Sequence, residues 1–545
     1  MPKESDFKAG LPPVLLHELL ARAAACWPSR TALTVGGEHF VYAQVQTQVE
    51  HCAAGLLALD VTRGARVAVY LEKRLETVVA SFSVPAAGGV LVPVNPLLKA
   101  QQVAHILQDA GATVLVTTAA RWAVVAPLVA HLPGLRHVVL CDGMPQGVQD
   151  AASGGLALHA WHDLLASRPA PLPALLESDV AVFFYTSGST GQPKAVVLSH
   201  RNLVAGATSV AGYLHNHADD TLLAVLPLSF DAGFSQLTTG FLVGARVVLL
   251  NYLLPRDVLQ ALVRERVTGL TAVPPLYMQL AALDWPSSPA LPLRYWANTG
   301  GRMPRATLQK LRQLAPGAQT YLMYGLTEAF RSTYLPPDQV DQRPESIGQA
   351  IPNAEVRVLR PDGSECAVDE PGELVHRGPL VALGYWNRPE ETARRFKPWP
   401  PALCGAGGEG LAPERAVYSG DTVRRDAEGF LYFVGRRDEM IKTSGYRVSP
   451  TEVEEVLYAS GLVAEALVYA VPDDALGSAV CAALLASPTA SGCGDTDNAA
   501  VLGHCREHLP AFMWPKVLHW VHQPLPRSPN GKLDRQRWMR EHGSI

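Results

Sequence analysis

The segment from Tyr185 to His200, YTSGSTGQPKAVVLSH, contains small polar residues, glycines and one lysine between two apolar runs. The loop in its middle, Thr186 to Lys194, offers backbone N–H groups, hydroxyl donors and a single ammonium. Such groups bind phosphate oxygens, and glycines let a phosphate approach the backbone closely. The loop differs from the common phosphate-binding pattern G-x-x-x-x-G-K-S/T, because Pro193 precedes the lysine and Ala195 follows it. By itself, the segment is compatible with a triphosphate-binding loop and with an ordinary Ser/Thr/Gly surface loop.

Further short polar motifs follow downstream. They are YGLTE (Tyr324 to Glu328), YSGD (Tyr418 to Asp421), GRRD (Gly435 to Asp438), KTSGYRVSPTE (Lys442 to Glu452) and PNGK (Pro529 to Lys532). Each alone is compatible with a turn. In this order, and together with the loop, they resemble the motifs of the ANL superfamily of adenylate-forming enzymes. The runs LMYGLTEAFRSTYLPP and TSGYRVSPTEVEEVL resemble most the AMP-forming acyl-CoA ligases associated with exosortase A systems. The resemblance covers nearly the whole chain.

The resemblance implies an ATP-binding site built from several motifs. Tyr324 would lie on the adenine ring, and Asp421 would accept hydrogen bonds from the ribose hydroxyls. Ser419 stands where the family usually has threonine, which leaves the Asp421 acceptor intact. The full set of implied ATP or AMP contacts is Thr186, Ser187, Gly188, Ser189, Thr190, Gly191, Lys194, Gly300, Gly301, Tyr324, Gly325, Asp421 and Arg436.

The resemblance also implies catalytic residues and a reaction in two steps. Thr327 would hydrogen-bond the α-phosphate, Glu328 would hold Mg²⁺ as a carboxylate ligand, and Lys532 would enter the site during adenylation. A carboxylic acid would attack ATP, release pyrophosphate and form an acyl-adenylate. The small domain would then turn about Asp438 and present Lys442 and Gly445, so that a thiol could attack. The acceptor would be CoA or a separate acyl carrier protein.

The acid pocket is expected around PLSFDAGFSQLTTGFLVGA, Pro227 to Ala245, and the residues after the YGLTE motif. The expected wall residues are Phe230, Asp231, Ser235, Met323 and Arg331. Asp231 has two interpretations: it pairs with a substrate amino group, or it caps the following helix. Arg331 also has two: it binds a polar or carboxylate group of the substrate, or it pairs with an acidic neighbour such as Asp231.

Composition limits the other function classes. The chain has 545 residues, 48% of them hydrophobic and 18% charged, with a formal charge of −4. This balance is typical of a soluble globular protein and argues against general binding of nucleic acid or anionic membranes. The N-terminal residues do not form a signal peptide, no window has the length of a membrane span, and the 8 cysteines lack close pairs. We therefore expect a cytoplasmic protein with reduced thiols.

Strand-like apolar runs alternate with helix-length segments, a pattern that predicts parallel sheets covered by helices. From about Glu345 to Val434 the runs are short and separated by turn residues, as in β-hairpins. We expect an α/β fold with a large N-terminal domain (1–437) of parallel sheets and helices plus a β-rich subdomain. A small, mobile α+β domain (438–545) would follow. The Gly-rich segment Cys404 to Gly410 is interpreted as a surface loop.

Two hypotheses from other classes stay open at this stage. A luciferase-like oxidase would share the adenylation step and then oxidise the adenylate. An inactive homologue would only bind nucleotide or acyl ligand, which the presence of Thr327, Glu328, Asp421, Arg436 and Lys532 disfavours.

Overall fold

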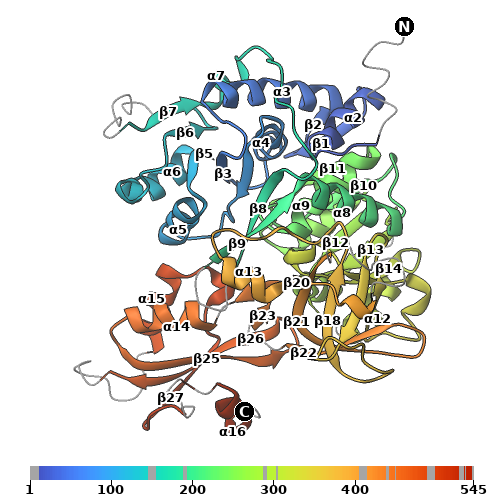
Figure 1. Ribbon diagram of the computed structural model, residues 1–545, viewed down its shortest axis with the longest axis vertical. Helices are drawn as coiled ribbons and strands as arrows, with labels where there is room; N and C mark the ends of the chain where they lie inside the picture. Colours follow the sequence, from blue (N-terminus) through green and yellow to red (C-terminus); the bar gives the residue numbers. More distant parts are fainter. Residues whose placement is uncertain are drawn as a thin grey trace.

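The computed structural model describes residues 12–144, 155–187, 193–286, 291–301, 303, 305–403, 414–436, 441–448, 450–487, 498–526, 533 and 535–542. Two large mixed sheets form the body of the protein, and a small sheet with its own helices lies at one end (Figure 1). The mixed α/β class and the small C-terminal α+β part agree with the sequence-based expectation.

The first sheet has 8 strands in the order β19-β9-β8-β4-β3-β5-β6-β7. Its strands from β4 to β7 are parallel, whereas β8 and β9 form an antiparallel hairpin. Bounds are β3 Arg66–Tyr70, β4 Val90–Pro93, β5 Ala112–Thr117, β6 His137–Leu140, β7 Ala157–Ala160, β8 Val180–Ser187, β9 Pro193–Ser199 and β19 Gly384–Tyr385. The helices in this part of the chain are α3 Tyr42–Ala58, α4 Leu75–Ala86, α5 Ala100–Ala110, α6 Ala119–Val125 and α7 Trp161–Leu165. The polar loop of the opening segment therefore connects two antiparallel strands.

The second sheet has 14 strands and changes character along its width. Strands β1 Thr31–Val35, β11 Arg246–Leu249, β10 Thr221–Ala224, β12 Gly269–Ala272, β13 Tyr295–Asn298 and β14 Gln319–Tyr324 are parallel. Antiparallel strands continue it: β15 Thr333–Leu335, β16 Ser346–Ala350, β22 Leu431–Arg436, β21 Arg415–Arg425, β18 Gly372–Arg377 and β17 Glu355–Leu359. β2 Glu38–Val41 closes the other edge, and β20 Phe396–Pro398 pairs with β21. The β-rich region is thus an extension of the parallel sheet.

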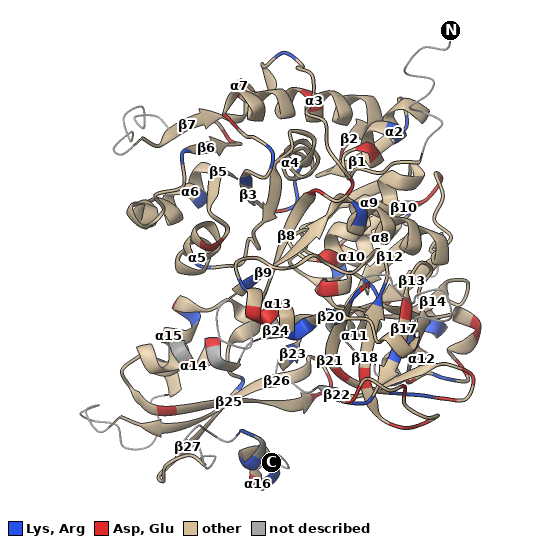
Figure 2. Ribbon diagram, viewed as in Figure 1, with Lys and Arg blue, Asp and Glu red and all other residues tan. Residues whose placement is uncertain are grey.

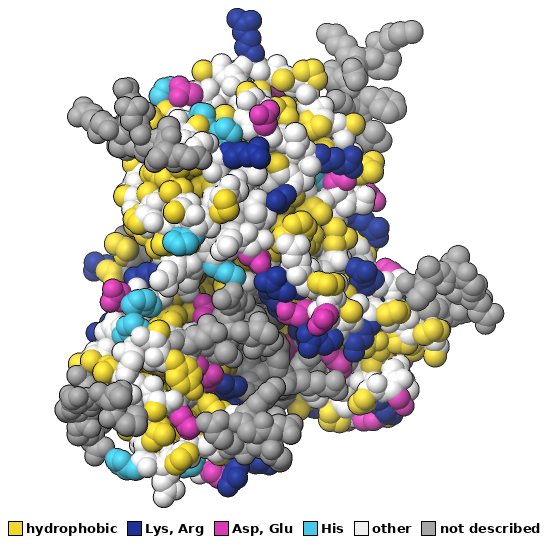
Figure 3. Space-filling model, turned by 60° about the vertical axis from the view of Figure 1, so that its left-hand side comes forward, with side chains coloured by type: hydrophobic (Ala, Val, Ile, Leu, Met, Phe, Trp, Pro, Cys, Tyr) yellow, Lys and Arg dark blue, Asp and Glu magenta, His cyan; other side chains and the backbone are white. Residues whose placement is uncertain are grey.

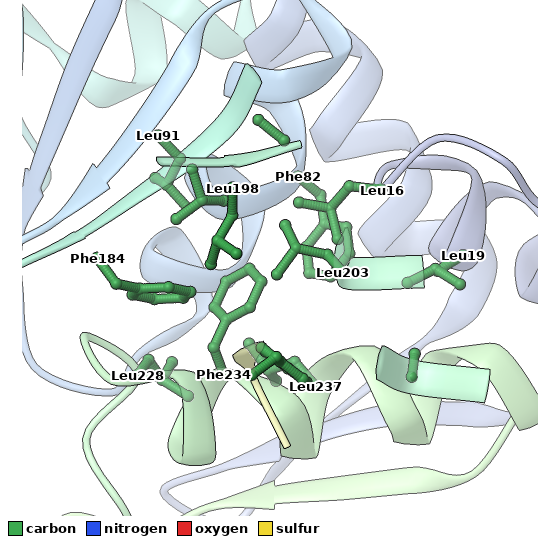
Figure 4. Close-up of a cluster of buried hydrophobic side chains, with 14 of the residues drawn as sticks. Leu16, Leu19, Phe82, Leu91, Phe184, Leu198, Leu203, Leu228, Phe234 and Leu237 are labelled. Carbon is green, nitrogen blue, oxygen red and sulfur yellow. The ribbon is translucent and has the colours of Figure 1, made fainter. Parts of the chain in front are cut away.

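Helices α8 (His200–Tyr213) and α9 (Asp231–Val243) lie between the two sheets. All residues of α9 from Gly233 to Phe241 are buried, as expected for a helix with sheets on both sides. Phe234 of α9 packs against Phe184 of β8 and Phe82 of α4 in the core shown in Figure 4. This packing fixes the start of α9, where the acid pocket is expected. The other helices of this half are α2 Glu18–Cys26, α10 Pro255–Arg264, α11 Pro274–Ala281 and α12 Arg305–Leu314.

The C-terminal part contains a two-stranded and a three-stranded sheet with separate hydrophobic clusters. Its elements are β23 Ile441–Thr443, β24 Tyr446–Val448, α14 Pro450–Ala459, β25 Val463–Asp473, β26 Gly477–Ala486, α15 Asn498–His508, β27 Val517–Val521 and α16 Arg535–His542. The proposed domain boundary at Asp438 lies outside the described residues, as does the Gly-rich segment Cys404 to Gly410.

The alternation of strand-like and helix-length segments expected from the sequence is present. For example, α5 ends at Ala110, and Gly111 follows it with a left-handed φ of 62°. One helix was not expected: α13, Pro389–Arg395, lies within the region interpreted as hairpins. Charges of both signs are interspersed over the face in Figure 3, in keeping with the small net charge. Among the described residues, no helix is both long and apolar enough to cross a membrane.

Candidate active site

The YGLTE motif lies at the carboxyl end of β14, the edge of a parallel sheet where ligands usually bind. A short 3₁₀ turn, Thr327–Ala329, follows the strand. It ends at Phe330, whose φ of 57° is rare for a residue with a side chain. The Phe330 ring is fully buried against Gly206 of α8, where a Cβ atom would lie 2.4 Å from it. Packing therefore maintains a strained turn between Glu328 and Arg331, as is common at functional sites.

Tyr324 connects this turn to the YSGD motif on β21. Its hydroxyl donates to Asp421 Oδ2 at 2.5 Å, and Asp421 is fully buried. The Ser419 hydroxyl accepts a hydrogen bond from the Asp421 backbone N–H at 3.1 Å. Gly420 between them has a φ of 67°, and a Cβ atom there would lie 2.4 Å from the Arg395 guanidinium. The serine that replaces the usual threonine thus still orients the aspartate.

Glu328 is held by a residue that the sequence analysis missed. The Tyr385 hydroxyl donates to Glu328 Oε1 at 2.6 Å, and the glutamate is 3% exposed. Tyr385 belongs to β19, which pairs with β9, the strand that follows the polar loop. The Lys194 ammonium lies 3.8 Å from the centre of the Tyr385 ring and 2.8 Å from Glu391 Oε2. In Figure 2 the start of α13, coloured red, lies near β9.

The polar loop is described only at its ends. Thr186 and Ser187 end β8, and Thr186 pairs with Lys194 across the hairpin. Gly188, Ser189, Thr190 and Gly191 lie outside the described residues, and so do Asp438, Lys532 and the side chain of Arg436. Their predicted roles stay predictions.

The glycines after β13 and β14 lie where backbones approach closely. Gly300 has a φ of 78°, and a Cβ atom on it would lie 3.5 Å from the Gly445 Cα of the small domain. The Asn298 side chain donates to the Gly301 carbonyl at 2.8 Å. A Cβ atom on Gly325 would lie 3.0 Å from the Arg331 Cα.

The loop between β23 and β24 faces this same edge of the large sheet. Gly445 has a φ of 81°, and a Cβ atom there would lie 2.5 Å from Val273 Cγ1. The next residue, Tyr446, stacks on Phe512 with ring centres 3.7 Å apart and meets the Phe230 ring edge-on at 5.3 Å. Burial raises the pKa of Tyr446 to about 12. The small domain thus contacts the large one through its glycine loop.

Lys442 also reaches the site from the small domain. Its ammonium lies 5.7 Å from the centre of the Tyr324 ring and 4.8 Å from that of Phe433. Gln102 of α5 adds a further contact, because its side-chain amide donates to Glu452 at 2.9 Å.

A cavity of about 20 Å³ lies between α8, α9 and the strands β10 and β12 to β14. Three of the predicted pocket residues line it: Ser235, Met323 and Arg331. Phe230 lies instead against Tyr446 at the start of α9. Asp231 contacts the cavity wall through Arg331, whose Nη1 lies 3.4 Å from Asp231 Oδ2.

The structure shows whether Asp231 caps α9 and whether Arg331 pairs with Asp231. Asp231 does not occupy the N-cap position of α9, because Phe230 does and Asp231 is the first helical residue. The helix-capping interpretation was therefore wrong. The ion pair between Arg331 and Asp231 is present, and the side chains are 3% and 14% exposed.

The chain matches known families along most of its length. The family model for the AMP-binding enzyme matches residues 20–386, and the model for its C-terminal domain matches residues 452–532. Feruloyl-CoA synthase from Amycolatopsis is 32% identical over 517 residues, 94% of this chain and 96% of its own. L-proline–[L-prolyl-carrier protein] ligase from Pseudomonas fluorescens is 31% identical over 532 residues, with 96% and 98% coverage.

Some relatives are much longer. The chain spans 10% and 6% of subunits D and C of linear gramicidin synthase from Brevibacillus parabrevis, at 29% and 30% identity. Among solved structures, o-succinylbenzoate CoA synthetase from Bacillus subtilis, a double mutant bound to a product analogue, has a TM-score of 0.79 and 26% identity. That match covers 95% of this chain and 97% of the other. Amide bond synthetase from Marinactinospora thermotolerans matches with the same TM-score and identity and covers 97% and 99%.

Proposed function

The chain belongs to the AMP-binding enzyme family, and we propose that it uses ATP to convert a carboxylic acid into an acyl-adenylate and then into a thioester, as an AMP-forming acyl-CoA ligase. One observation carries the proposal. At the carboxyl end of β14, Tyr324 bonds Asp421 while Glu328 bonds Tyr385, so that the YGLTE motif, β21 and the strand beside the polar loop meet.

The adenylation step follows from these groups. Asp421 accepts hydrogen bonds from the ribose hydroxyls, and Tyr324, which it orients, packs on the adenine. Thr327 bonds the α-phosphate, while Lys194 and the loop before it contact the triphosphate. Since nucleotidyl transfer depends mainly on positioning and charge neutralisation, a rigid buried set of this kind is suited to it.

Glu328 fits the role of a Mg²⁺ ligand. It offers a buried carboxylate with one oxygen fixed by Tyr385, and carboxylate and phosphate oxygens are the ligands that Mg²⁺ prefers. Among the described residues no group of three or more His, Cys, Asp or Glu side chains could hold a metal alone, as expected for an ion bound mainly by phosphates and water. Bound there, Mg²⁺ would neutralise charge on the phosphates of ATP.

The thiol step is supported by the position of the Gly445 loop. The loop lies against Val273 and near Gly300, at the mouth of the site, while Lys442 lies over Tyr324. We assign this arrangement to thioester formation and expect the small domain to turn about Asp438 so that Lys532 can enter for adenylation. The boundary lies in the interval between the two family matches.

CoA and a carrier protein are the two candidate acceptors. A relative named as a carrier-protein ligase and one named as a CoA synthase are about equally similar to this chain, at 31% and 32% identity. The Arg331–Asp231 ion pair supports an acid without an amino group, because Asp231 already has a cationic partner. We therefore favour CoA ligation over loading of an amino acid on a carrier protein.

The test is pyrophosphate release measured over fatty, aryl and amino acids, each with ATP and Mg²⁺, with and without CoA. We expect acid-dependent pyrophosphate release, and a thioester only when CoA is present. Adenylate formation without thioester would favour the carrier-protein alternative. No acid-dependent release from any acid would overturn the proposal.

A further inference from the structure

Hydrogen-bonding groups line the cavity beside Arg331 together with apolar side chains. The polar wall residues are Ser235, Gln236, Thr239, Thr271 and Arg331. The apolar lining includes Leu214 and Leu222. Tyr295 also lines the cavity and packs on Gly269 of β12, where a Cβ atom would lie 2.5 Å from the tyrosine hydroxyl.

Two buried polar atoms of these walls have no hydrogen-bond partner among the described residues: Gln236 Oε1 and Arg331 Nε. Gln236 is 7% exposed and Arg331 is 3% exposed. The Gln236 amide nitrogen donates to the Thr271 carbonyl at 3.1 Å, which fixes the amide orientation and identifies the free atom as an acceptor. The walls thus present one unused acceptor and one unused donor, and leaving such atoms buried and unpaired is unfavourable.

The walls carry no excess charge. Arg331 Nη1 is already paired with Asp231, and it also donates to the Phe330 carbonyl at 3.0 Å. A carboxylate or ammonium on the substrate would bring an uncompensated charge to a buried ion pair, at a large desolvation cost. An uncharged polar group carries no such cost.

The sheet register gives the depth of the cavity. Its β12 wall residues, Gly269 and Thr271, pair with Tyr295 and Ala297 of β13. Those positions lie two to four residues before Thr299, the first residue after β13, which at about 3.3 Å per residue is about 7–13 Å along the strand direction.

We propose, resting on the proposed function, that the protein activates an acid with an uncharged hydroxyl group about 7–13 Å from its carboxylate. The hydroxyl accepts from Arg331 Nε and donates to Gln236 Oε1, and it is the smallest group that does both. The cavity of about 20 Å³ has room for a group of that size, since a single water needs about 10–15 Å³. An alkyl end would leave both wall atoms unpaired.

The test compares four acids of nearly equal length: 8-hydroxyoctanoate, nonanoate, nonanedioate and 8-aminooctanoate. The kcat/KM for acid-dependent pyrophosphate release is measured for each. We expect the hydroxy acid to exceed the other three by about 10-fold or more, as for a site that hydrogen-bonds a substrate hydroxyl. In a second series, 4-hydroxycinnamate is expected to exceed 4-methylcinnamate.

Two variants test whether the preference for the hydroxy acid arises in the cavity beside Arg331. Gln236→Met removes the acceptor with little change in volume and should reduce the hydroxyl preference to less than about threefold while nonanoate turnover stays measurable. Thr238→Val, on the same helix but outside the cavity walls, should keep it. Turnover of these acids without a hydroxyl preference, or a preference unchanged in Gln236→Met, would overturn the inference and leave the proposed function standing. Absence of pyrophosphate release with every acid would instead overturn the proposed function.

Discussion

Replacing Gly445 with alanine is expected to impair thioester formation and spare adenylation. The new Cβ atom would lie 2.5 Å from Val273 Cγ1, well inside an ordinary contact distance, and Val273 belongs to the large domain. Overpacking of this kind costs about 1–3 kcal/mol. That cost applies only when the Gly445 loop faces the site, so it disfavours one arrangement of the domains. At 1.36 kcal/mol per tenfold, the thiol step should slow by about 5- to 150-fold.

A matched control separates the clash from backbone strain. Gly461 also has a positive φ, of 71°, but a Cβ atom there would meet nothing within 4 Å. Gly461→Ala therefore carries the cost of a left-handed alanine, about 1–2 kcal/mol, without the contact between domains. The assays are ATP–pyrophosphate exchange for adenylation and single-turnover reaction of purified acyl-adenylate with CoA for thioester formation. Equal losses in both half-reactions of Gly445→Ala, or the same selective loss in Gly461→Ala, would refute the reasoning. Val273→Ala added to Gly445→Ala should restore the rate.

Lys532→Ala should abolish adenylate formation while largely sparing thioester formation from supplied adenylate; equal loss of both half-reactions would contradict domain rotation. Tyr385→Phe removes the 2.6 Å bond to Glu328 but keeps the ring beneath Lys194, so the Mg²⁺ concentration for half-maximal pyrophosphate exchange should rise about 5- to 50-fold with the KM for the acid nearly unchanged. An unchanged Mg²⁺ dependence would argue against this positioning role. Burial lowers the pKa of His376 to about 3, so the folded state binds fewer protons than the unfolded state between about pH 6.5 and 3. The stability that the neutral His376 provides is complete above pH 6.5, and the free energy of unfolding decreases by up to about 1.4 kcal/mol for each unit that the pH falls below it. In urea unfolding, His376→Asn should weaken this loss of stability at acid pH. Substitution of the exposed His131 should leave the loss unchanged.

The positions of the strands could be predicted from the sequence, but the way in which β8 and β9 pair could not. The apolar run of β8 and the run of β9 are readable as strands, yet an apolar run does not reveal strand direction. Only the structure shows the antiparallel register in which Thr186 faces Lys194. The extension of the parallel sheet runs through β15 and β16 and then depends on a long-range pairing, that of β16 with β22, in which Ser346 faces Tyr432.

In the candidate site, too, some residues could be predicted from the sequence and others could not. Tyr324, Glu328 and Asp421 could be identified from motifs whose spacing is local. Tyr385 could not, because the segment GYWN carries no periodic signal, and only the pairing of β19 with β9 brings its hydroxyl to Glu328. Arg331 and its possible partner Asp231 were both named from the sequence, but only the contact between these residues, 100 positions apart, shows that they pair.

The most direct test of the central claim follows oxygen from the acid. An acid of the preferred class, labelled with ¹⁸O in both carboxylate oxygens, is turned over with ATP, Mg²⁺ and CoA, and the products are analysed by mass spectrometry. Attack of the carboxylate on the α-phosphorus followed by thiol attack on the adenylate predicts one ¹⁸O in each AMP and none in pyrophosphate. Label in pyrophosphate or in inorganic phosphate, or AMP without label while thioester accumulates, would contradict an acyl-adenylate intermediate.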